Sequence, residues 1–163
     1  MNLIVAVDRN WAIGYQNDLL VRISPDLKRF KALTLGHAVL LGRKTLETFP
    51  GGRPLPSRPN FILSTDPAYT VEGATVLHSV DEAVTCCPED AFVIGGASIY
   101  NAMLPHCDTA FVTKIDADFP ADVWFPNLDE NPAWEISEEE PPLTDNGVTF
   151  HYVTYKKVKQ HVR

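Results

Sequence analysis

Short apolar runs alternate with helical patterns over the first two thirds of the chain. The runs predict β-strands at residues 3–7, 38–41, 60–64, 74–77, 91–94 and 109–115. The segments between them predict helices at residues 25–35, 44–49, 80–87 and 98–104. Strands that alternate with helices are typical of β-α-β units, so we expect a mostly parallel sheet.

The pattern changes after residue 115. Segments 134–138 and 148–157 are strand-like without a helical pattern between them, and Asp145-Asn146-Gly147 is a strong turn signal. An antiparallel hairpin is therefore expected at the C-terminal end. The whole prediction is an α/β fold with one domain over residues 1–163, a mostly parallel central sheet of about eight strands and about four flanking helices.

Composition agrees with a single domain. A chain of 163 residues with 45% hydrophobic content can bury one core. The first apolar run ends at Asp8 and is too short for a signal peptide or a membrane span. Cys86 and Cys87 are adjacent and Cys107 is left without a partner, so we expect reduced thiols and a cytoplasmic location.

The net charge of −7 is unevenly distributed along the chain. Residues 22–58 carry eight basic side chains and two acidic ones, whereas residues 66–145 carry seventeen acidic side chains and only Lys114. A chain this acidic is a poor general nucleic-acid binder, but its basic segment suits a small polyanion. Two solvated faces of opposite charge are the alternative interpretation.

Two predicted strands end in glycine at the start of a helix: Gly95-Gly96 follows the run at 91–94, and Gly42-Arg43-Lys44-Thr45 follows the run at 38–41. Glycine lets a ligand approach the main chain, and the free N–H groups of a helix start favour phosphate. Neither segment fits G-x-x-x-x-G-K-[ST] or G-x-G-x-x-G. A plain turn and a solvated basic helix start are the alternatives, but parallel strands place both segments at one sheet edge.

Asp26 is a candidate anchor or acid. Ser24-Pro25-Asp26 has the order of a helix start, with serine as the N-cap, so Asp26 is also explained as a partner of the helix dipole. It shares a helix face with Phe30, four residues on. A carboxylate on an apolar face either pairs with a cationic ligand or shifts towards its neutral form.

Arg58 lies in a proline-rich loop that stiffens its backbone. Arginine binds a carboxylate in bidentate fashion, so an acidic substrate tail is one interpretation and an ordinary surface arginine the other. Ser64 and Thr65, after the third predicted strand, are candidate donors to a further phosphate. No metal site is expected, because metal-ligand spacing is absent among His37, His78, His106, His151 and His161.

Several segments occur in an order that characterises one enzyme family. They are Ile4-Val5-Ala6-Val7-Asp8 with Ile13-Gly14, Pro25-Asp26-Leu27-Lys28-Arg29-Phe30-Lys31, Leu41-Gly42-Arg43-Lys44-Thr45, Gly52-Arg53-Pro54-Leu55-Pro56-Ser57-Arg58-Pro59-Asn60, Val93-Ile94-Gly95-Gly96, and Thr113-Lys114-Ile115-Asp116 with Asp122 and Phe125-Pro126. Over nearly its whole length the chain resembles dihydrofolate reductases of the bacterial type.

The resemblance implies that 7,8-dihydrofolate is reduced to tetrahydrofolate, with hydride delivered to C6 of the pterin and a proton to N5. It implies that Asp26 binds the 2-amino and N3 edge of the pterin and promotes protonation through water, supported by Thr113. Arg58 would hold the α-carboxylate of the glutamate tail. The implied substrate pocket is lined by Ile4, Val5, Ala6, Leu27, Phe30, Phe49, Leu55, Ile94 and Tyr100.

The same resemblance implies NADPH as the cofactor, with Arg43 and Ser64 at its 2′-phosphate. The peptide bond between Gly95 and Gly96 is cis in the resembled family. The nicotinamide would lie near Ala6, Ile13, Gly14, Thr45 and Tyr100, and the pyrophosphate near Gly42, Arg43, Lys44, Thr45, Gly95, Gly96, Ala97, Ser98 and Ile99.

Some positions depart from the family pattern. Val21 stands where a tryptophan that helps to fix a water near Asp26 is usual, and Leu20 stands where proline is common. Ala121 replaces a frequent glycine, and Ser98 and His78 stand where some relatives carry basic residues. We expect these differences to affect loop motion and cofactor binding and to leave the reaction type unchanged.

Two other functions stay open from the sequence. A pyrimidine reductase of riboflavin synthesis shares the fold and the Gly-Gly turn, but is not expected to pair Asp26 with Arg58 at these spacings. A non-catalytic module would bind a dinucleotide without turnover. The expected partners are dihydrofolate and NADPH, without nucleic acid or membrane, and nothing in the sequence requires more than a monomer.

Overall fold

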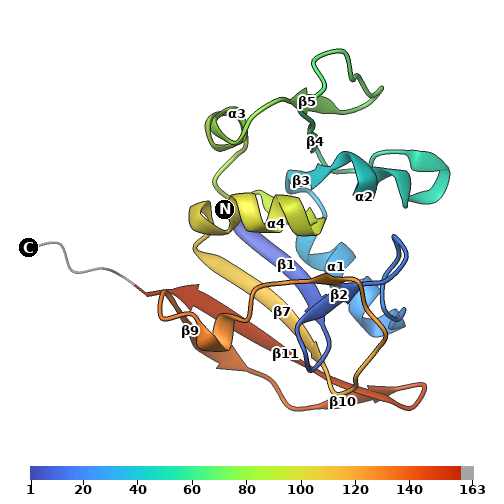
Figure 1. Ribbon diagram of the computed structural model, residues 1–163, viewed down its shortest axis with the longest axis vertical. Coiled ribbons are helices and arrows are strands. Elements are labelled where there is room, and N and C mark those ends of the chain that lie inside the picture. Colours follow the sequence, from blue (N-terminus) through green and yellow to red (C-terminus); the bar gives the residue numbers. More distant parts are fainter. Residues whose placement is uncertain (159–163) are drawn as a thin grey trace, which may run out of the picture.

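A nine-stranded sheet forms the centre of the computed structural model, which describes residues 1–158 (Figure 1). The strand order is β10-β11-β7-β1-β6-β3-β4-β5, and β9 also pairs with β11. The last five residues of the predicted domain, which include His161, lie outside the described residues.

The parallel part of the sheet is built around β1 (Asn2–Val7), which lies between β7 (Thr109–Ile115) and β6 (Phe92–Gly95). The sheet continues through β3 (Val39–Gly42), β4 (Asn60–Leu63) and β5 (Thr75–Leu77), and each of these neighbours is parallel. Strands covered on both faces are expected to be apolar, as β3 is throughout and β1 is after Asn2. The predicted mostly parallel α/β sheet is confirmed.

The C-terminal part is antiparallel, as predicted. The long strand β11 (Val148–Lys157) pairs with β7 on one side and on the other with β9 (Trp134–Glu139) and β10 (Leu143–Asp145). The turn after Asp145 therefore joins β11 to the short β10, whereas β9 pairs with the far half of β11. This short additional strand makes the sheet one strand larger than expected.

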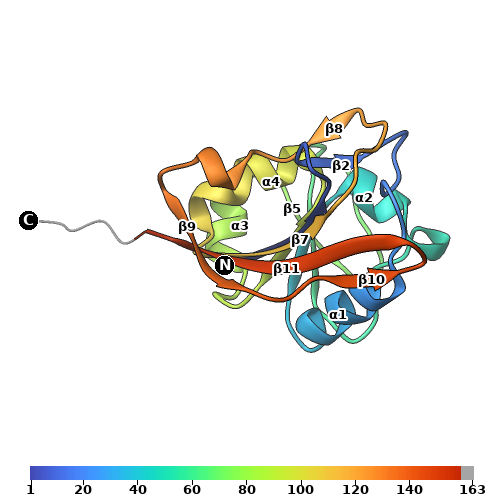
Figure 2. The ribbon, with the colours of Figure 1, turned by 90° about the horizontal axis from the view of Figure 1, so that it is seen from below.

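Four helices flank the sheet: α1 (Ser24–Thr34), α2 (Arg43–Glu47), α3 (Val80–Cys86) and α4 (Ala97–Met103). Figure 2 shows α1 on one side of the sheet and α3 and α4 on the other. Alternate residues of β1 reach both sides, because side chains alternate along a strand. Leu3 packs in a core with Met103 of α4, whereas Ile4 packs in a second core with Phe30 of α1.

Five further short elements were not predicted. Strands β2 (Ala12–Gly14) and β8 (Val123–Trp124) form a separate antiparallel pair, and three 3₁₀ turns occur at η1 (Pro50–Gly52), η2 (Leu104–His106) and η3 (Leu128–Glu130). The β2-β8 pair joins two loops that are far apart in the sequence, so no local pattern announces it.

Helix boundaries differ slightly from the prediction. The predicted Ser24 N-cap is wrong: Ser24 is already helical, Ile23 occupies the cap position, and no side chain caps the first turn. Helix α2 ends at Glu47, two residues early, and Thr48 and Phe49 continue as a turn. Within residues 1–158, no helix has the length and apolarity needed to cross a membrane.

Candidate active site

Asp26 lies in the first turn of α1 and is hydrogen-bonded to the central sheet. The Thr113 hydroxyl donates to Asp26 Oδ1 at 2.6 Å, although the two residues are 87 positions apart in the sequence. Thr113 is buried on β7, directly opposite Ala6 of β1. The carboxyl group is therefore held at the junction of α1 with two sheet strands.

Burial raises the pKa of Asp26 above its ordinary value, because a charged carboxylate is less stable away from water. The hydrogen bond from Thr113 and the positive charge of Arg29 lower this pKa and partly offset the effect of burial. A carboxyl group with a raised pKa exchanges a proton at a pH closer to neutrality. This is the property expected of a group that promotes protonation.

Apolar side chains that are only partly covered gather on the α1 side of the sheet. Leu27, beside Asp26, leaves 40% of its surface exposed. The partly buried members of the second core that the sequence assigned to a substrate pocket are Phe30, Phe49, Leu55 and Ile94, and they pack with the buried Ile4. Exposed apolar surface beside a half-buried carboxyl group suits a flat, partly polar ligand.

Two of the expected substrate contacts lie on the opposite side of the sheet. The Val5 side chain packs in the core with Leu3 and Val7, because alternate residues of a strand face opposite sides. Tyr100 packs in that same core, but its hydroxyl donates to the Ile4 carbonyl at 2.7 Å. Burial raises the pKa of this tyrosine, so it stays protonated and links α4 to β1.

Arg58 is held in place by hydrogen bonds to neighbouring groups. Its Nε donates to the Pro56 carbonyl at 2.9 Å and its Nη1 donates to the Thr34 hydroxyl at 3.1 Å. Thr34 in turn donates to the Phe30 carbonyl at 2.8 Å. Thr34 was not predicted from the sequence. It is a small polar residue in the last turn of α1, four residues after Phe30, and it is the buried residue of this helix.

The two glycine segments lie together, because β3 and β6 are neighbours and Leu41 is opposite Gly95. The Gly95-Gly96 peptide is cis, as the resemblance implies. A Cβ atom at Gly42 would lie 2.9 Å from Ile99 Cγ1, and one at Gly96 would lie 3.3 Å from Thr45 Oγ1. A side chain at Gly42 would force Ile99 to move, and one at Gly96 would lie tightly against Thr45, so glycine at these positions permits the close approach of the two turns.

Comparison with known proteins agrees with this geometry. The family model for dihydrofolate reductase matches residues 1–157. The chain belongs to the dihydrofolate reductase family.

Individual relatives are similar over almost their full length. A dihydrofolate reductase from Bacillus subtilis (strain 168) is 37% identical, covering 96% of this chain and 94% of that protein. Dihydrofolate reductase type 3 from Salmonella typhimurium is also 37% identical, with 96% and 98% covered. The solved dihydrofolate reductase from Enterococcus faecalis, complexed with NADP(H) and RAB-propyl, superimposes with a TM-score of 0.85 at 32% identity, covering 97% of this chain and 96% of that one.

In this member of the dihydrofolate reductase family, Arg43 lies at the start of α2. The groups around it were not predicted from the sequence. Its guanidinium lies 4.3 Å from the ring centroid of Tyr69 and 3.7 Å from Asp66 Oδ2. The Asp66 amide donates to the Ser64 hydroxyl at 3.3 Å, so the structure brings Arg43 and Ser64 to one place. The neighbouring Lys44, Thr65 and Ser98 are exposed, and Ala97 is partly buried.

The loop that carries Ile13 and Gly14 is joined to a distant loop through Asp122. The Asp122 amide donates to the Gly14 carbonyl at 3.0 Å, and the Gln16 amide donates to the Asp122 carboxylate at 3.0 Å. Ile13 is partly buried against the core on the α4 side. Ala121, the departure from the family pattern noted above, directly precedes this connection and is partly buried.

Val21 and Leu20 precede α1. Val21 packs against a third core, which contains Ile23, Phe150 and Tyr152 and also Ala6. An aliphatic side chain therefore stands beside Tyr152 where the family usually has tryptophan. His78, another departure, is hydrogen-bonded through Nδ1 to the Ser64 carbonyl at 2.9 Å.

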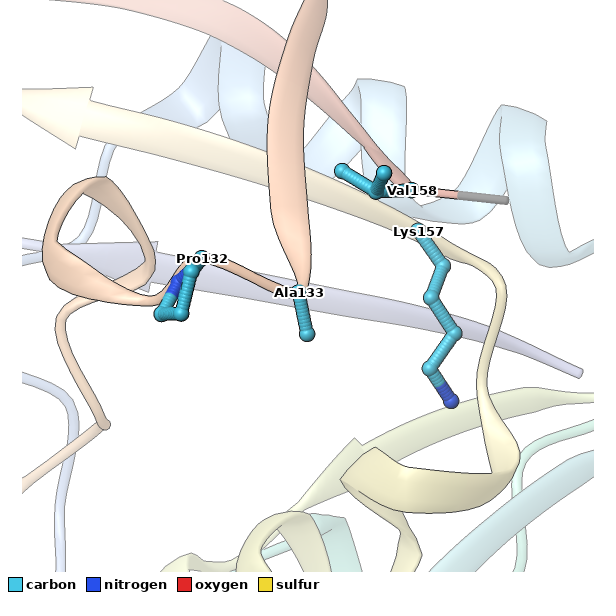
Figure 3. A pocket seen from close by; sticks show the side chains of 4 residues that line it. All are labelled: Pro132, Ala133, Lys157 and Val158. Atoms are coloured by element: carbon cyan, nitrogen blue, oxygen red, sulfur yellow. The ribbon is translucent and has the colours of Figure 1, made fainter. Parts of the chain in front are cut away.

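A hollow of about 590 Å³ lies at the opposite end of β11, lined by Pro132, Ala133, Lys157 and Val158 (Figure 3). Lys156 is opposite Thr109 at the start of β7, whereas Tyr152 is opposite Thr113 near its end. This hollow therefore contains none of the predicted site residues. Among residues 1–158, no group of three or more His, Cys, Asp or Glu side chains is arranged to hold a metal ion.

Proposed function

We propose that the protein catalyses the reduction of 7,8-dihydrofolate to 5,6,7,8-tetrahydrofolate with NADPH. The reaction adds a hydride to C6 of the pterin and a proton to N5, and NADPH supplies the hydride when it is bound. The observation that carries this proposal is the Thr113-supported carboxyl group of Asp26, beside exposed apolar surface in a chain of this family.

Asp26 is the proposed anchor for the pterin. Its raised pKa suits a carboxyl group that accepts hydrogen bonds from the 2-amino and N3 positions and promotes protonation of N5 through water. Thr113 fixes the orientation of the carboxyl group and is a positioning residue. The proposed substrate contacts are Ile4, Val5, Ala6, Leu27, Phe30, Phe49, Leu55, Ile94 and Tyr100, with Val5 contributing its backbone, since its side chain packs on the other side of the sheet.

Arg58 is proposed to bind the α-carboxylate of the glutamate tail. Burial lowers the pKa of its guanidinium, which means that the positive charge is incompletely solvated and gains from an anionic partner. The bonds to Pro56 and Thr34 restrict the guanidinium and reduce the entropy lost on binding. Thr34 is therefore a proposed positioning residue for substrate binding.

NADPH is proposed to bind at the edge formed by the two glycine turns, where Gly42 and Gly96 let the starts of α2 and α4 approach each other closely. Arg43 and Ser64, with Thr65, are the proposed contacts of the 2′-phosphate. The proposed contacts of the pyrophosphate are Gly42, Arg43, Lys44, Thr45, Gly95, Gly96, Ala97, Ser98 and Ile99. The nicotinamide is proposed to lie near Ala6, Ile13, Gly14, Thr45 and Tyr100.

We also propose that the enzyme is a single domain and that it is located in the cytoplasm.

The direct test mixes the purified protein with dihydrofolate and NADPH and follows the loss of reduced-nicotinamide absorbance. The proposal predicts turnover with NADPH and weaker activity with NADH, because the exposed cation of Arg43 lies beside Ser64 and can bind a 2′-phosphate in place of its carboxylate partners Asp66 and Glu47. Cofactor binding without turnover would favour the non-catalytic module. Turnover only with an aminopyrimidine intermediate of riboflavin synthesis would favour the pyrimidine reductase.

A further inference from the structure

Arg29 is a basic residue at the site that is not among the proposed contacts of the substrate or the cofactor. It is three residues after Asp26 on α1, and residues at this spacing are neighbours on a helix surface. Its side chain is 21% exposed, unlike those of Lys28 and Lys31 on the same helix, which face solvent. Arg29 therefore places a positive charge beside Asp26 in a partly desolvated environment.

Two groups hold the Arg29 guanidinium there. Its central carbon lies 3.8 Å from the ring centroid of Tyr152 on β11, which is the geometry of a cation-π contact. Its Nη2 lies 3.6 Å from Glu140 Oε2. The Glu140 backbone N–H donates to the Tyr152 carbonyl at 2.9 Å, so the main chains that carry the ring and the carboxylate lie side by side and both side chains reach the guanidinium.

The groups around Asp26 come from each element packed against it. Thr113 on β7 donates its hydrogen bond, Tyr152 on β11 is a neutral neighbour, and Arg29 on α1 is the positive charge. Glu140, in the loop after β9, is an anion that balances Arg29 from its far side. The Asp26 carboxylate and the Glu140 carboxylate therefore share the field of one guanidinium.

We propose that Arg29, held between the Tyr152 ring and the Glu140 carboxylate, is a positioning residue that keeps the Asp26 carboxylate charged and thereby sets the pH range of catalysis. The inference rests on the proposed dihydrofolate reduction for its catalytic consequence. Its electrostatic part concerns the ligand-free protein alone. The influence of Arg29 on the pKa of Asp26 supports the same direction, since its charge opposes the effect of burial.

The catalytic consequence has a definite sign. Hydride transfer to C6 requires one additional proton on the pair formed by Asp26 and the pterin, and a nearby cation disfavours that proton wherever it resides. Removing the charge of Arg29 will therefore raise the pH at which the rate of hydride transfer falls to half of its maximum. Removing the charge of Glu140 will strengthen the effect of Arg29 and move this pH downward.

The test is a carboxyl titration of Asp26 by NMR in the ligand-free protein, with the resonance assigned by its loss in Asp26→Asn. Arg29→Met should raise the Asp26 titration midpoint by about half a pH unit or more. Arg29→Lys, which keeps the charge, should largely restore it. Glu140→Gln should lower it, and Lys28→Gln, which removes a solvent-facing charge from the same helix, should leave it in place.

An unchanged midpoint in Arg29→Met, or shifts of the same sign in Arg29→Met and Glu140→Gln, would overturn the inference. Glu140 is about half exposed, so Glu140→Gln is expected to fold. It therefore decides the sign of the shift in the Asp26 titration midpoint even if Arg29→Met does not fold. The half-maximal pH of hydride transfer should move with the titration midpoint in each variant. If the wild-type protein fails to oxidise NADPH with dihydrofolate, the proposed function is wrong, whereas the titration still decides the role of Arg29.

Discussion

Asp26 lies where burial and its neighbours act in opposite directions on one carboxyl group. Burial raises its pKa, while the Thr113 hydrogen bond and the charge of Arg29 lower it. The carboxyl group is close enough to apolar groups for its pKa to be raised, and it is still accessible to a ligand. This balance suits proton transfer, but it also makes the charged form unfavourable for the fold.

The first prediction concerns the rate. Asp26→Asn should lower the rate of hydride transfer on the order of 100-fold near neutral pH, because the amide cannot promote protonation of N5. The loss should grow as the pH rises, since protonating the substrate then becomes limiting. Stopped-flow measurement of NADPH oxidation over a range of pH checks this, and a rate equal to that of the wild type would remove Asp26 from the mechanism.

The same substitution should stabilise the fold. The pKa of Asp26 is higher in the folded than in the unfolded chain, so ionisation destabilises the folded protein fully above the folded pKa and not at all below the unfolded one. Asp26→Asn should therefore raise Tm by about 1–3 °C at neutral pH, with Asn still accepting the Thr113 hydrogen bond.

This gain should shrink as the pH falls through the raised pKa of Asp26 and should vanish below the pKa of an unfolded aspartate, about 3.9. Calorimetry at several pH values checks this dependence. The matched control is Glu89→Gln, which removes an exposed carboxylate and should leave Tm nearly unchanged at neutral pH. A lower Tm for Asp26→Asn at neutral pH would contradict the electrostatic account.

Arg58 gives a prediction about substrate binding. Arg58→Leu should raise the KM for dihydrofolate about 10- to 100-fold, because a charge-assisted bidentate contact contributes about 1.5–3 kcal/mol. The NADPH affinity should be unchanged. Thr34→Val should raise the same KM by a smaller factor, since it removes one of the hydrogen bonds that orient Arg58. An equal effect of Arg58→Leu on both ligands would refute the assignment.

At the scale of elements, the site depends on where neighbouring strands end. The β3 and β6 termini could be predicted, because each apolar run stops at glycine, and the observed strands end at Gly42 and Gly95. The β2-β8 pair and the Asp122 connection could not be predicted, because both join segments more than 100 residues apart. Their pairing depends on tertiary contacts rather than on local pattern.

Gly42 tests the close approach of these elements. In Gly42→Ala, the new Cβ would lie 2.9 Å from Ile99 Cγ1, and the branched isoleucine side chain has little freedom to move away. Separating α2 from α4 should weaken NADPH binding about 10-fold, in line with overpacking costs of about 1–3 kcal/mol. Fluorescence titration with NADPH measures this.

The control is Gly147→Asn, in the hairpin turn between β10 and β11. Nothing lies within 4 Å of a Cβ at that position, and asparagine tolerates its positive φ of 77°. This variant should bind NADPH as tightly as the wild type. An unchanged NADPH affinity in Gly42→Ala would mean that the contact between the two turns does not shape the cofactor site.

At the scale of the whole molecule, one sheet separates the core that packs with α4 from the core that packs with α1, and it brings the candidate site to the ends of its strands. The alternation of strands and helices predicted this architecture. Sequence motifs also identified Asp26, Thr113 and Arg58. They did not identify Thr34, which is hydrogen-bonded to Arg58, or Tyr152, whose ring contacts Arg29, because these contacts form only in the folded chain. The nine-stranded sheet places Tyr152 of β11 opposite Thr113 of β7, next to α1.

The most direct test of the proposed reaction follows one hydrogen atom. The wild-type protein is incubated with dihydrofolate and NADPH that carries deuterium at the transferable position of nicotinamide C4, and the product is examined by NMR. The account predicts tetrahydrofolate with deuterium at C6 and none at N5 after exchange with water. No reduced product, or product without deuterium at C6, would contradict it.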